Sequence, residues 1–122
     1  MSYKEISESN QNTYETKAKC PILYALDIVG QKWKIPIMWH LLEQESIRYN
    51  ELKRSITGIT NMMLTKSLQE LEAHQLVNRL QYATIPPKVE YSLTERGKAI
   101  LPALNALSMW GEEQIKIDIM NL

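Results

Sequence analysis

The 122-residue sequence predicts an α+β, mainly helical fold: a winged helix-turn-helix with extra helices at both ends. Between Tyr49 and Leu93, apolar spacing and turn residues indicate a short helix, a tight connection, a second helix and two strand-like runs. The second helix combines one apolar stripe with a polar opposite face, and positive charge is in excess over the same stretch. In domains with this order of elements, the second helix lies in the DNA major groove.

The chain before this unit is predicted to form a polar arm and two helices. Residues 1–19 are polar, and we expect an arm that is either loose or helical where a partner subunit covers it. A helix begins after Cys20 with Pro21 at its first position, where the missing N–H costs nothing, and Gly30 ends it. Its predicted buried side is Ile22, Leu23, Ala25, Leu26 and Val29. A second helix is predicted from Trp33 to about Glu43, with Trp33, Ile37, Leu41 and Leu42 toward the core.

The helix-turn-helix is predicted from Tyr49 to Ala73. Residues 46–48 form a very short strand, and a helix follows over Tyr49–Ser55. After a tight connection at residues 56–59, Thr60 caps a second helix over Asn61–Ala73. Leu64, Leu68 and Leu71 recur at i, i+4 and i+7, which gives this helix one buried stripe.

The face opposite that stripe is predicted to contact DNA. It carries Met62, Thr65, Lys66 and Gln69, with Asn61 at its edge. We expect four of these residues to approach base edges: Asn61, Thr65, Lys66 and Gln69. We expect three others to meet phosphates: Arg48, Lys53 and Arg54. The alternative is an ordinary exposed helix face.

Two strands, Val77–Tyr82 and Val89–Leu93, are predicted to form the wing, with its tip at residues 83–88. Pro86-Pro87 stiffens the tip, so less entropy is lost when the wing docks. We expect Lys88 to enter or border the minor groove. The alternative is a solvated hairpin tip that contacts nothing.

A long helix capped by Thr94 and kinked by Pro102 is predicted to follow the wing. Apolar residues continue at helical spacing beyond the point where a winged-helix core is closed. We therefore predict a dimer interface, as a winged helix usually binds palindromic DNA as a symmetric pair. Its candidate residues are Leu104, Leu107, Trp110 and Ile115. The alternative is a helix folded back onto its own domain. The predicted division is an arm at 1–19, a DNA-binding domain at 20–93 and dimerisation helices at 94–122.

Composition and motif content limit the classes of function expected of this chain. The net charge is zero, but residues 46–98 hold eight Lys and Arg against five Asp and Glu, which suits phosphate contacts. No run reaches the roughly 18 apolar residues of a membrane span, so we expect a cytoplasmic protein without membrane association. With one cysteine and no ligand spacing for His40 or His74, we expect no disulfide framework, metal or cofactor. No nucleophile–base spacing or phosphate loop is present, so an enzyme is not predicted.

Cys20 is a candidate redox-sensing residue. It lies at a predicted helix N-terminus, where partial positive charge favours an anion. Lys17 and Lys19 are near it in sequence, and such surroundings lower the pKa of a thiol. Oxidation would then lead to an intersubunit disulfide, a mixed disulfide or an electrophile adduct. The alternative is a small packing residue with no signalling role.

Several motifs resemble the HxlR-type bacterial transcription regulators. They are Cys20-Pro21, Gly30-Gln31-Lys32-Trp33, Arg48-Tyr49-Asn50-Glu51-Leu52, residues 56–60, Leu64-Thr65 with residues 68–72, residues 86–94, Leu101-Pro102 and Trp110-Gly111. The double-proline wing motif is the most specific of them. Gln31 and Asn61 depart from the family pattern, so operator sequence does not transfer. The resemblance implies a homodimeric DNA-binding regulator whose terminal helices form the dimer. Some members of the family sense electrophiles, oxidants or aldehydes through the cysteine that matches Cys20, so the resemblance implies the same for this residue.

Two functions from different classes follow. One is a sequence-specific regulator that binds double-stranded DNA at a palindromic operator. The other is a winged helix that docks on another protein and does not bind DNA. Segment charge and the polar helix face favour DNA, whereas the neutral total and Met62 favour a protein partner. The effector, the operator and the choice between activator and repressor are not encoded in any motif.

Overall fold

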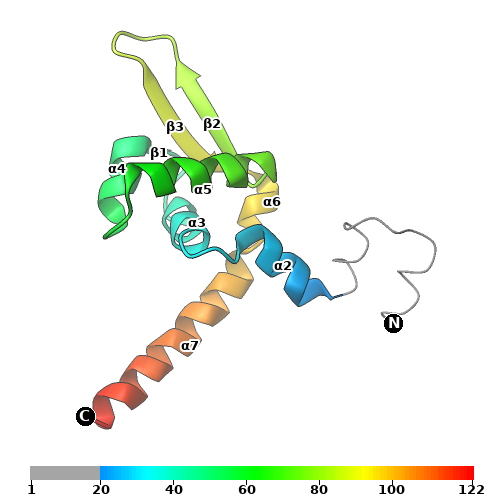
Figure 1. Ribbon diagram of the computed structural model, residues 1–122, viewed down its shortest axis with the longest axis vertical. Coiled ribbons are helices and arrows are strands. Elements are labelled where there is room, and N and C mark those ends of the chain that lie inside the picture. Colours follow the sequence, from blue (N-terminus) through cyan, green and yellow to red (C-terminus); the bar gives the residue numbers. More distant parts are fainter. Residues whose placement is uncertain (1–19) are drawn as a thin grey trace, which may run out of the picture.

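The computed structural model describes residues 20–122, so the arm predicted at residues 1–19 lies outside the described residues. The elements are α2 (Pro21–Val29), α3 (Lys34–Leu42), β1 (Ile47–Arg48), α4 (Tyr49–Ser55), α5 (Asn61–Ala73), β2 (Val77–Tyr82), β3 (Lys88–Leu93), α6 (Glu95–Lys98) and α7 (Leu101–Met120). Figure 1 shows α5 across the front of the body and the β2–β3 hairpin rising from it as the wing. The predicted winged helix-turn-helix is confirmed, and β3 begins one residue earlier than predicted.

The wing is part of a three-stranded antiparallel sheet in the order β1-β3-β2. Strands β2 and β3 pair along their full length, from Val77 opposite Leu93 to Tyr82 opposite Lys88. The short strand β1 pairs Ile47 with Tyr91 at the base of the hairpin. Because β1 leads directly into α4, this pairing fixes the helix-turn-helix relative to the wing.

The tight turn before α5 depends on two local features. Gly58 has a φ of 88°, a left-handed conformation that side chains rarely adopt. The predicted cap at Thr60 is confirmed, since its Oγ1 accepts from the backbone N–H of Met63 at 3.1 Å. The start of α5 is therefore determined by residues next to it in sequence.

The end of α5 uses a non-glycine residue in the left-handed conformation. Gln75 has a φ of 63°. Its N–H donates to the Glu72 carbonyl at 2.9 Å, and the N–H of Leu76 donates to the Leu71 carbonyl at 2.9 Å. This pair of bonds is the Schellman arrangement, and Leu71 and Leu76, at the two positions whose apolar side chains often accompany it, are both buried in the core cluster.

Helix α6 docks on this end of α5. The Thr94 hydroxyl donates to the Gln75 carbonyl at 2.7 Å, and Arg96 Nη1 donates to the His74 carbonyl at 2.9 Å. A Cβ on Gly97 would lie 2.2 Å from the Leu76 carbonyl oxygen, so only glycine fits this close approach. The chain after the wing is thus tied to the end of α5.

The prediction of one long helix kinked by Pro102 is wrong. Thr94 does act as an N-cap, with its Oγ1 accepting from Gly97 N–H at 3.0 Å, but it caps the short α6. Two turn residues then separate α6 from α7. Pro102 lies in the first turn of α7, where its missing N–H forfeits no helical bond. The proline therefore begins a helix instead of bending one.

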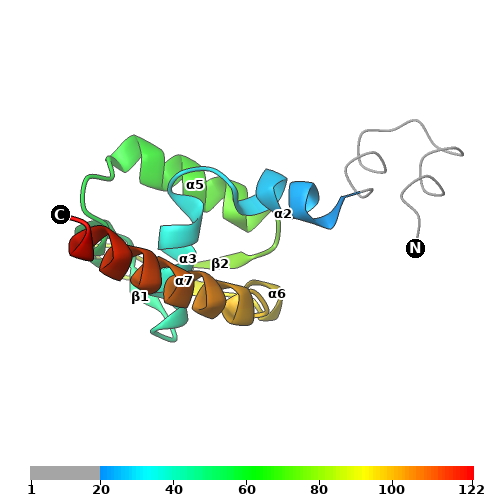
Figure 2. The same ribbon diagram turned by 90° about the horizontal axis from the view of Figure 1, so that it is seen from below.

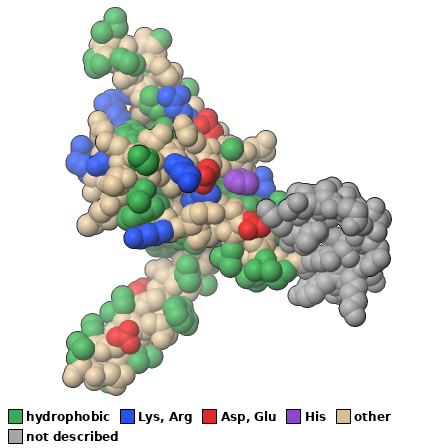
Figure 3. All heavy atoms as spheres, viewed as in Figure 1, with side chains coloured by type: hydrophobic (Ala, Val, Ile, Leu, Met, Phe, Trp, Pro, Cys, Tyr) green, Lys and Arg blue, Asp and Glu red, His purple; other side chains and the backbone are tan. Residues whose placement is uncertain are grey.

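Helices α2 and α7 project from the body. Figures 1 and 2 show α2 leaving one side and α7 extending on the side away from the wing. Exposed apolar side chains cover much of α7, including Leu107, Met109, Trp110, Ile115, Ile117, Ile119 and Met120. Figure 3 shows hydrophobic side chains as green patches along the lower arm. No helix within residues 20–122 combines the length and apolar content needed to span a membrane.

The predicted buried side of α2 is wrong for four of its five residues. Only Val29 is buried, whereas Ile22 is 70% and Leu23 is 61% exposed, and Ala25 and Leu26 are exposed as well. Because α2 extends past the body, most of its apolar stripe meets no described part of its own chain.

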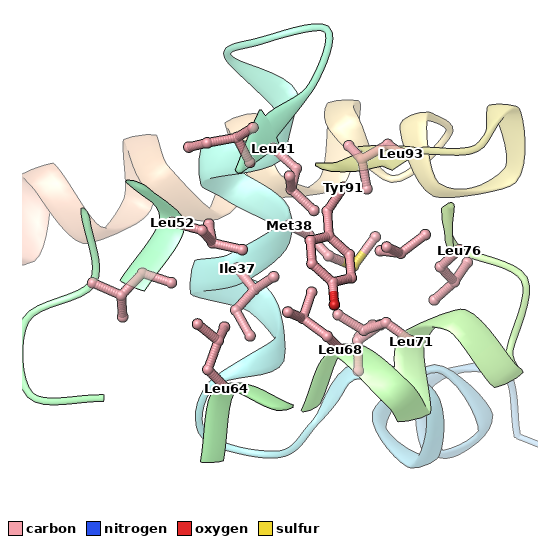
Figure 4. Packing of buried hydrophobic residues seen from close by; sticks show 14 of the residues in the cluster. Ile37, Met38, Leu41, Leu52, Leu64, Leu68, Leu71, Leu76, Tyr91 and Leu93 are labelled. Atoms are coloured by element: carbon pink, nitrogen blue, oxygen red, sulfur yellow. The ribbon is translucent and has the colours of Figure 1, made fainter. Parts of the chain in front are cut away.

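The core lies where α3, α5 and the sheet meet (Figure 4). Its fully buried side chains are Ile37, Met38 and Leu41 from α3, Leu52 from α4, and Leu64, Leu68 and Leu71 from α5. The predicted stripe of α5 is confirmed, as are Ile37 and Leu41. Trp33 and Leu42 are only partly buried, whereas Met38, which the sequence analysis did not select, is fully buried.

Candidate nucleic-acid interface

The outward face of α5 carries the residues expected to read bases. Asn61, Thr65, Lys66 and Gln69 are exposed, and Met62 beside them is 80% exposed. Within the described residues, Lys66 and Gln69 form no hydrogen bond or ion pair. Their side chains are therefore available for a ligand without breaking an internal bond.

Tyr49 holds the start of this face, although the sequence analysis did not select it. Its hydroxyl lies 3.0 Å from Thr65 Oγ1 and donates to Asn61 at 3.2 Å. Thr65 and Asn61 thus share a partner from α4, which restricts their rotamers. A tyrosine at the start of a helix has no periodic signal, so only the packing of α4 against α5 reveals this role.

Arg79 is a second residue that sequence reasoning missed. It projects from β2 into an open hollow of about 510 Å³ between α5 and the wing, shared with Thr65 and Gln69. Its Nη2 donates to Gln81 Oε1 at 3.3 Å on the same strand. The available signal was the spacing of Arg79 and Gln81 at i and i+2 in β2, since alternate side chains of a strand point toward the same face.

The residues expected to meet phosphates divide into two groups. Arg48 and Arg54 line a larger hollow, of about 890 Å³, between α4 and the wing tip, and Lys88 lies on its other side. Lys53 is half-buried and is not part of this hollow. Three cations therefore surround one concave surface, and the fourth lies apart from it.

Lys88 lies at the base of the wing tip. Its Nζ is 4.3 Å from the centroid of the Tyr82 ring and 3.7 Å from Glu90 Oε2. The Tyr82 hydroxyl donates to Glu90 Oε1 at 2.9 Å, and this bond raises the pKa of Tyr82. The tip itself has no charged residue between positions 83 and 87, and Ile85 there is fully exposed. The ammonium is thus held back against the hairpin.

An ion pair between a buried lysine and a partly exposed glutamate links α3 to α5. Lys34, 2% exposed, places its Nζ 2.9 Å from Glu70 Oε1 on α5 and 3.3 Å from the Ile28 carbonyl on α2. This hydrogen-bonded lysine lowers the pKa of Glu70. A lysine in the first turn of a helix is ordinarily solvated, so no local pattern indicates this contact.

The four candidate dimer residues differ in exposure. Leu107, Trp110 and Ile115 are 50%, 63% and 59% exposed. Leu104 is 4% exposed and belongs to the core of its own chain, because it lies at the point where α7 leaves the body beside α3. It is therefore removed from the candidate interface.

Cys20 is the N-cap residue of α2 and is half-buried. Lys17 and Lys19, which are near it in sequence, lie outside the described residues. The structure therefore relates Cys20 to a redox-sensing role only through its position at the start of the projecting helix α2.

Positive charge is spread over the face that α5 presents. Figure 3 looks onto this face and shows Lys and Arg side chains at several places around the helix, with the apolar wing tip above. An exposed polar helix with cations on its flanks has the shape and charge to enter a groove of duplex DNA.

Comparisons with known proteins agree with this geometry. A sequence profile described as HxlR-like helix-turn-helix matches residues 28–118. The HTH-type transcriptional regulator YybR of Bacillus subtilis is 43% identical over 102 residues, which cover 84% of this chain and 81% of YybR. The redox regulator HypR in its oxidized form has a TM-score of 0.73 and 44% identity, covering 77% of this chain and 96% of that one. Diamide-treated YodB from B. subtilis has a TM-score of 0.62 and 30% identity, covering 77% and 93%.

Proposed function

This chain belongs to the HxlR-like helix-turn-helix family of transcriptional regulators, and we propose that it binds a palindromic operator as a homodimer. The observation that carries the proposal is the outward face of α5, where Lys66 and Gln69 form no hydrogen bond or ion pair with any of residues 20–122 and the wing stands alongside. A gel-shift with the DNA upstream of its own gene, at two salt concentrations, tests it. We expect sequence-specific binding that weakens as salt rises.

The base-reading role is assigned to Lys66 and Gln69. Lysine recognises guanine and glutamine recognises adenine in the major groove, each good contact giving about 1–3 kcal/mol of discrimination. Thr65 and Asn61, held by Tyr49, supply shorter contacts at the helix start. Gln69→Ala should change base preference at one or two positions in a binding-site selection. An unchanged preference, at equal folding, removes Gln69 from the reading set.

Arg48, Arg54 and Lys53 are assigned to phosphates, which contribute affinity with little sequence choice. Lys88 borders the minor groove in this proposal, and its contacts with Tyr82 and Glu90 must loosen for it to do so. If Lys88→Ala leaves affinity and salt dependence as they are, the wing does not contact DNA through this residue.

The apolar sides of α2 and α7 support the homodimer. Leu107, Trp110 and Ile115 leave a stripe in solvent that a second copy would cover, and aromatic anchors often dominate such interfaces. Ending the chain after Trp110 should produce monomers and abolish tight operator binding. Sedimentation of a full-length protein that is monomeric at micromolar concentration would count against the dimer.

Redox control through Cys20 is the regulatory part of the proposal. HypR is described as a redox regulator, and the YodB structure is of a diamide-treated protein. Cys20 occupies the N-cap position of α2, so an adduct or disulfide there acts on a helix assigned to the dimer and changes the spacing of the two α5 helices. DNA affinity of wild type and Cys20→Ser, with and without diamide, is the comparison. Equal affinity of wild type before and after treatment makes Cys20 a packing residue.

A protein-docking module remains the second candidate, favoured by the exposed Met62 on α5. The same gel-shift separates the two functions. A protein-docking module gives no shift with any duplex at low salt, whereas a DNA-binding protein retains salt-sensitive binding even to unrelated sequence.

A further inference from the structure

The loop between α2 and α3 lies beside α5 on the flank opposite the wing. One hollow at α5 is lined by Thr65 and Gln69 together with Arg79 of the wing. Another is lined by Met63, Lys66, Ser67 and Glu70 together with Gln31 and Trp33 of this loop. The outward face of α5 therefore lies between the wing on one side and residues 30–33 on the other.

Trp33 anchors this loop to the helix-turn-helix. Its Nε1 lies 3.0 Å from Met63 Sδ, toward which it donates, and its ring packs against the core cluster. A Cβ on Gly58 in the turn would lie 3.9 Å from the edge of the ring. The loop is thus held at the beginning of α5 by a large rigid side chain.

Lys32 places a positive charge on this anchor. Its Nζ is 4.8 Å from the centroid of the Trp33 ring, and the residue is exposed. No carboxylate among residues 20–122 forms an ion pair with it. Lys34, two positions on, is the opposite case, because its ammonium is buried against Glu70. Of these two lysines, only Lys32 has its charge available to a ligand.

The geometry of the major groove gives a cation on this flank of α5 a phosphate to contact. A helix in this groove has a phosphate strand on each side, since the groove is only about 12 Å wide between its two backbones. The wing and the hollow lined by Arg48 and Arg54 serve one side of α5. We propose that Lys32, positioned by Trp33, contacts the phosphate strand on the other side. This inference rests on the proposed DNA-binding function and adds a contact to it.

The test compares Lys32→Gln and Lys32→Glu with the wild type, with Lys98→Gln on α6 as the control, an exposed lysine whose ammonium pairs with Glu95. Operator affinity is measured from 50 to 200 mM salt. Each lost phosphate contact lowers the magnitude of the salt slope by about 0.9, so Lys32→Gln should lower it by about 1.8 for two copies in a dimer.

We expect Lys32→Gln to weaken binding several-fold on both operator and unrelated DNA without changing base preference, and Lys32→Glu to weaken it further. Lys98→Gln should match the wild type. An unchanged slope and affinity for both Lys32 variants, with the wild type still binding, overturns the Lys32 contact alone. A wild type that binds no duplex at any of these salt concentrations overturns the DNA-binding function and this contact together.

Discussion

The buried pair Lys34–Glu70 leads to an asymmetric prediction for stability. Lys34 is almost fully enclosed, whereas the Glu70 side chain is 41% exposed. Removing the carboxylate leaves a buried ammonium with only the Ile28 carbonyl, 3.3 Å away. Removing the ammonium leaves a carboxylate that water already reaches. Substitution of Glu70 should therefore cost more than substitution of Lys34.

The magnitudes follow from this geometry. Leaving a buried charge unpaired costs about 3–5 kcal/mol, and we reduce this to about 2–3 for Glu70→Leu because Ile28 still accepts and solvent screens the exposed partner. Glu70→Gln keeps an acceptor and should cost about 1 kcal/mol. Lys34→Met fills the same space without a charge and should stay within about 1 kcal/mol of wild type.

Urea unfolding of the three variants at one protein concentration measures these differences, since dimer formation makes stability depend on concentration. The pH gives a second check. The pKa of Glu70 is lowered from 4.5 in the folded protein, so its stabilisation is present above that value and is lost as pH falls through the folded pKa. The deficit of Glu70→Gln should therefore shrink below pH 4.5. A Lys34→Met variant less stable than Glu70→Leu would refute the reasoning.

Three further predictions concern backbone and hydrogen-bond geometry. Gly97→Ala should lower the free energy of unfolding by about 2–3 kcal/mol, because its Cβ meets the Leu76 carbonyl. Gly111→Ala, whose Cβ meets nothing within 4 Å, should raise the free energy of unfolding by about 0.5–1 kcal/mol, and urea unfolding measures both. Equal stability of the two would contradict this. Gln75→Gly should gain up to about 1 kcal/mol by relieving a left-handed conformation, and a lower melting temperature would argue against it. Tyr49→Phe should lower the free energy of unfolding by about 0.5–1.5 kcal/mol, because the hydrogen bond to the start of α5 is lost. It should also broaden base preference in a binding-site selection, since the side chains at the start of α5 are then less restricted. An unaltered preference would make the hydroxyl purely structural.

The helix-turn-helix was predictable because its signals are local. The stripe of Leu64, Leu68 and Leu71, the cap at Thr60 and the left-handed Gly58 all act within a few residues of one another. Helix period and capping chemistry depend on neighbours in sequence, so they survive without knowledge of the fold. The same holds for the exposed face of α5, which is the side of the helix opposite that stripe.

The apolar stripe of α2 shows where such reasoning stops. Periodicity predicts that one side of a helix is buried, and it does not identify the surface that buries it. Ile22, Leu23 and Leu26 were assigned to the core, yet they project with α2 beyond the body. Leu104 is the reverse case, because it was assigned to a partner and lies in its own core.

By itself, the sequence determined the order of elements in the helix-turn-helix and wing, the bounds of α4 and α5, the core stripe of α5 and the set of polar residues opposite it. The tertiary structure alone decided which polar and charged side chains are available to a ligand and which are held by another residue. The Tyr49 hydroxyl lies within hydrogen-bond distance of Thr65, 16 residues away. Lys34 is buried against Glu70, and the ammonium of Lys88 lies over the Tyr82 ring. Periodicity is a property of residues close in sequence. The partner of a hydrogen bond or a charge is set by how separate elements pack, and no local pattern carries that information.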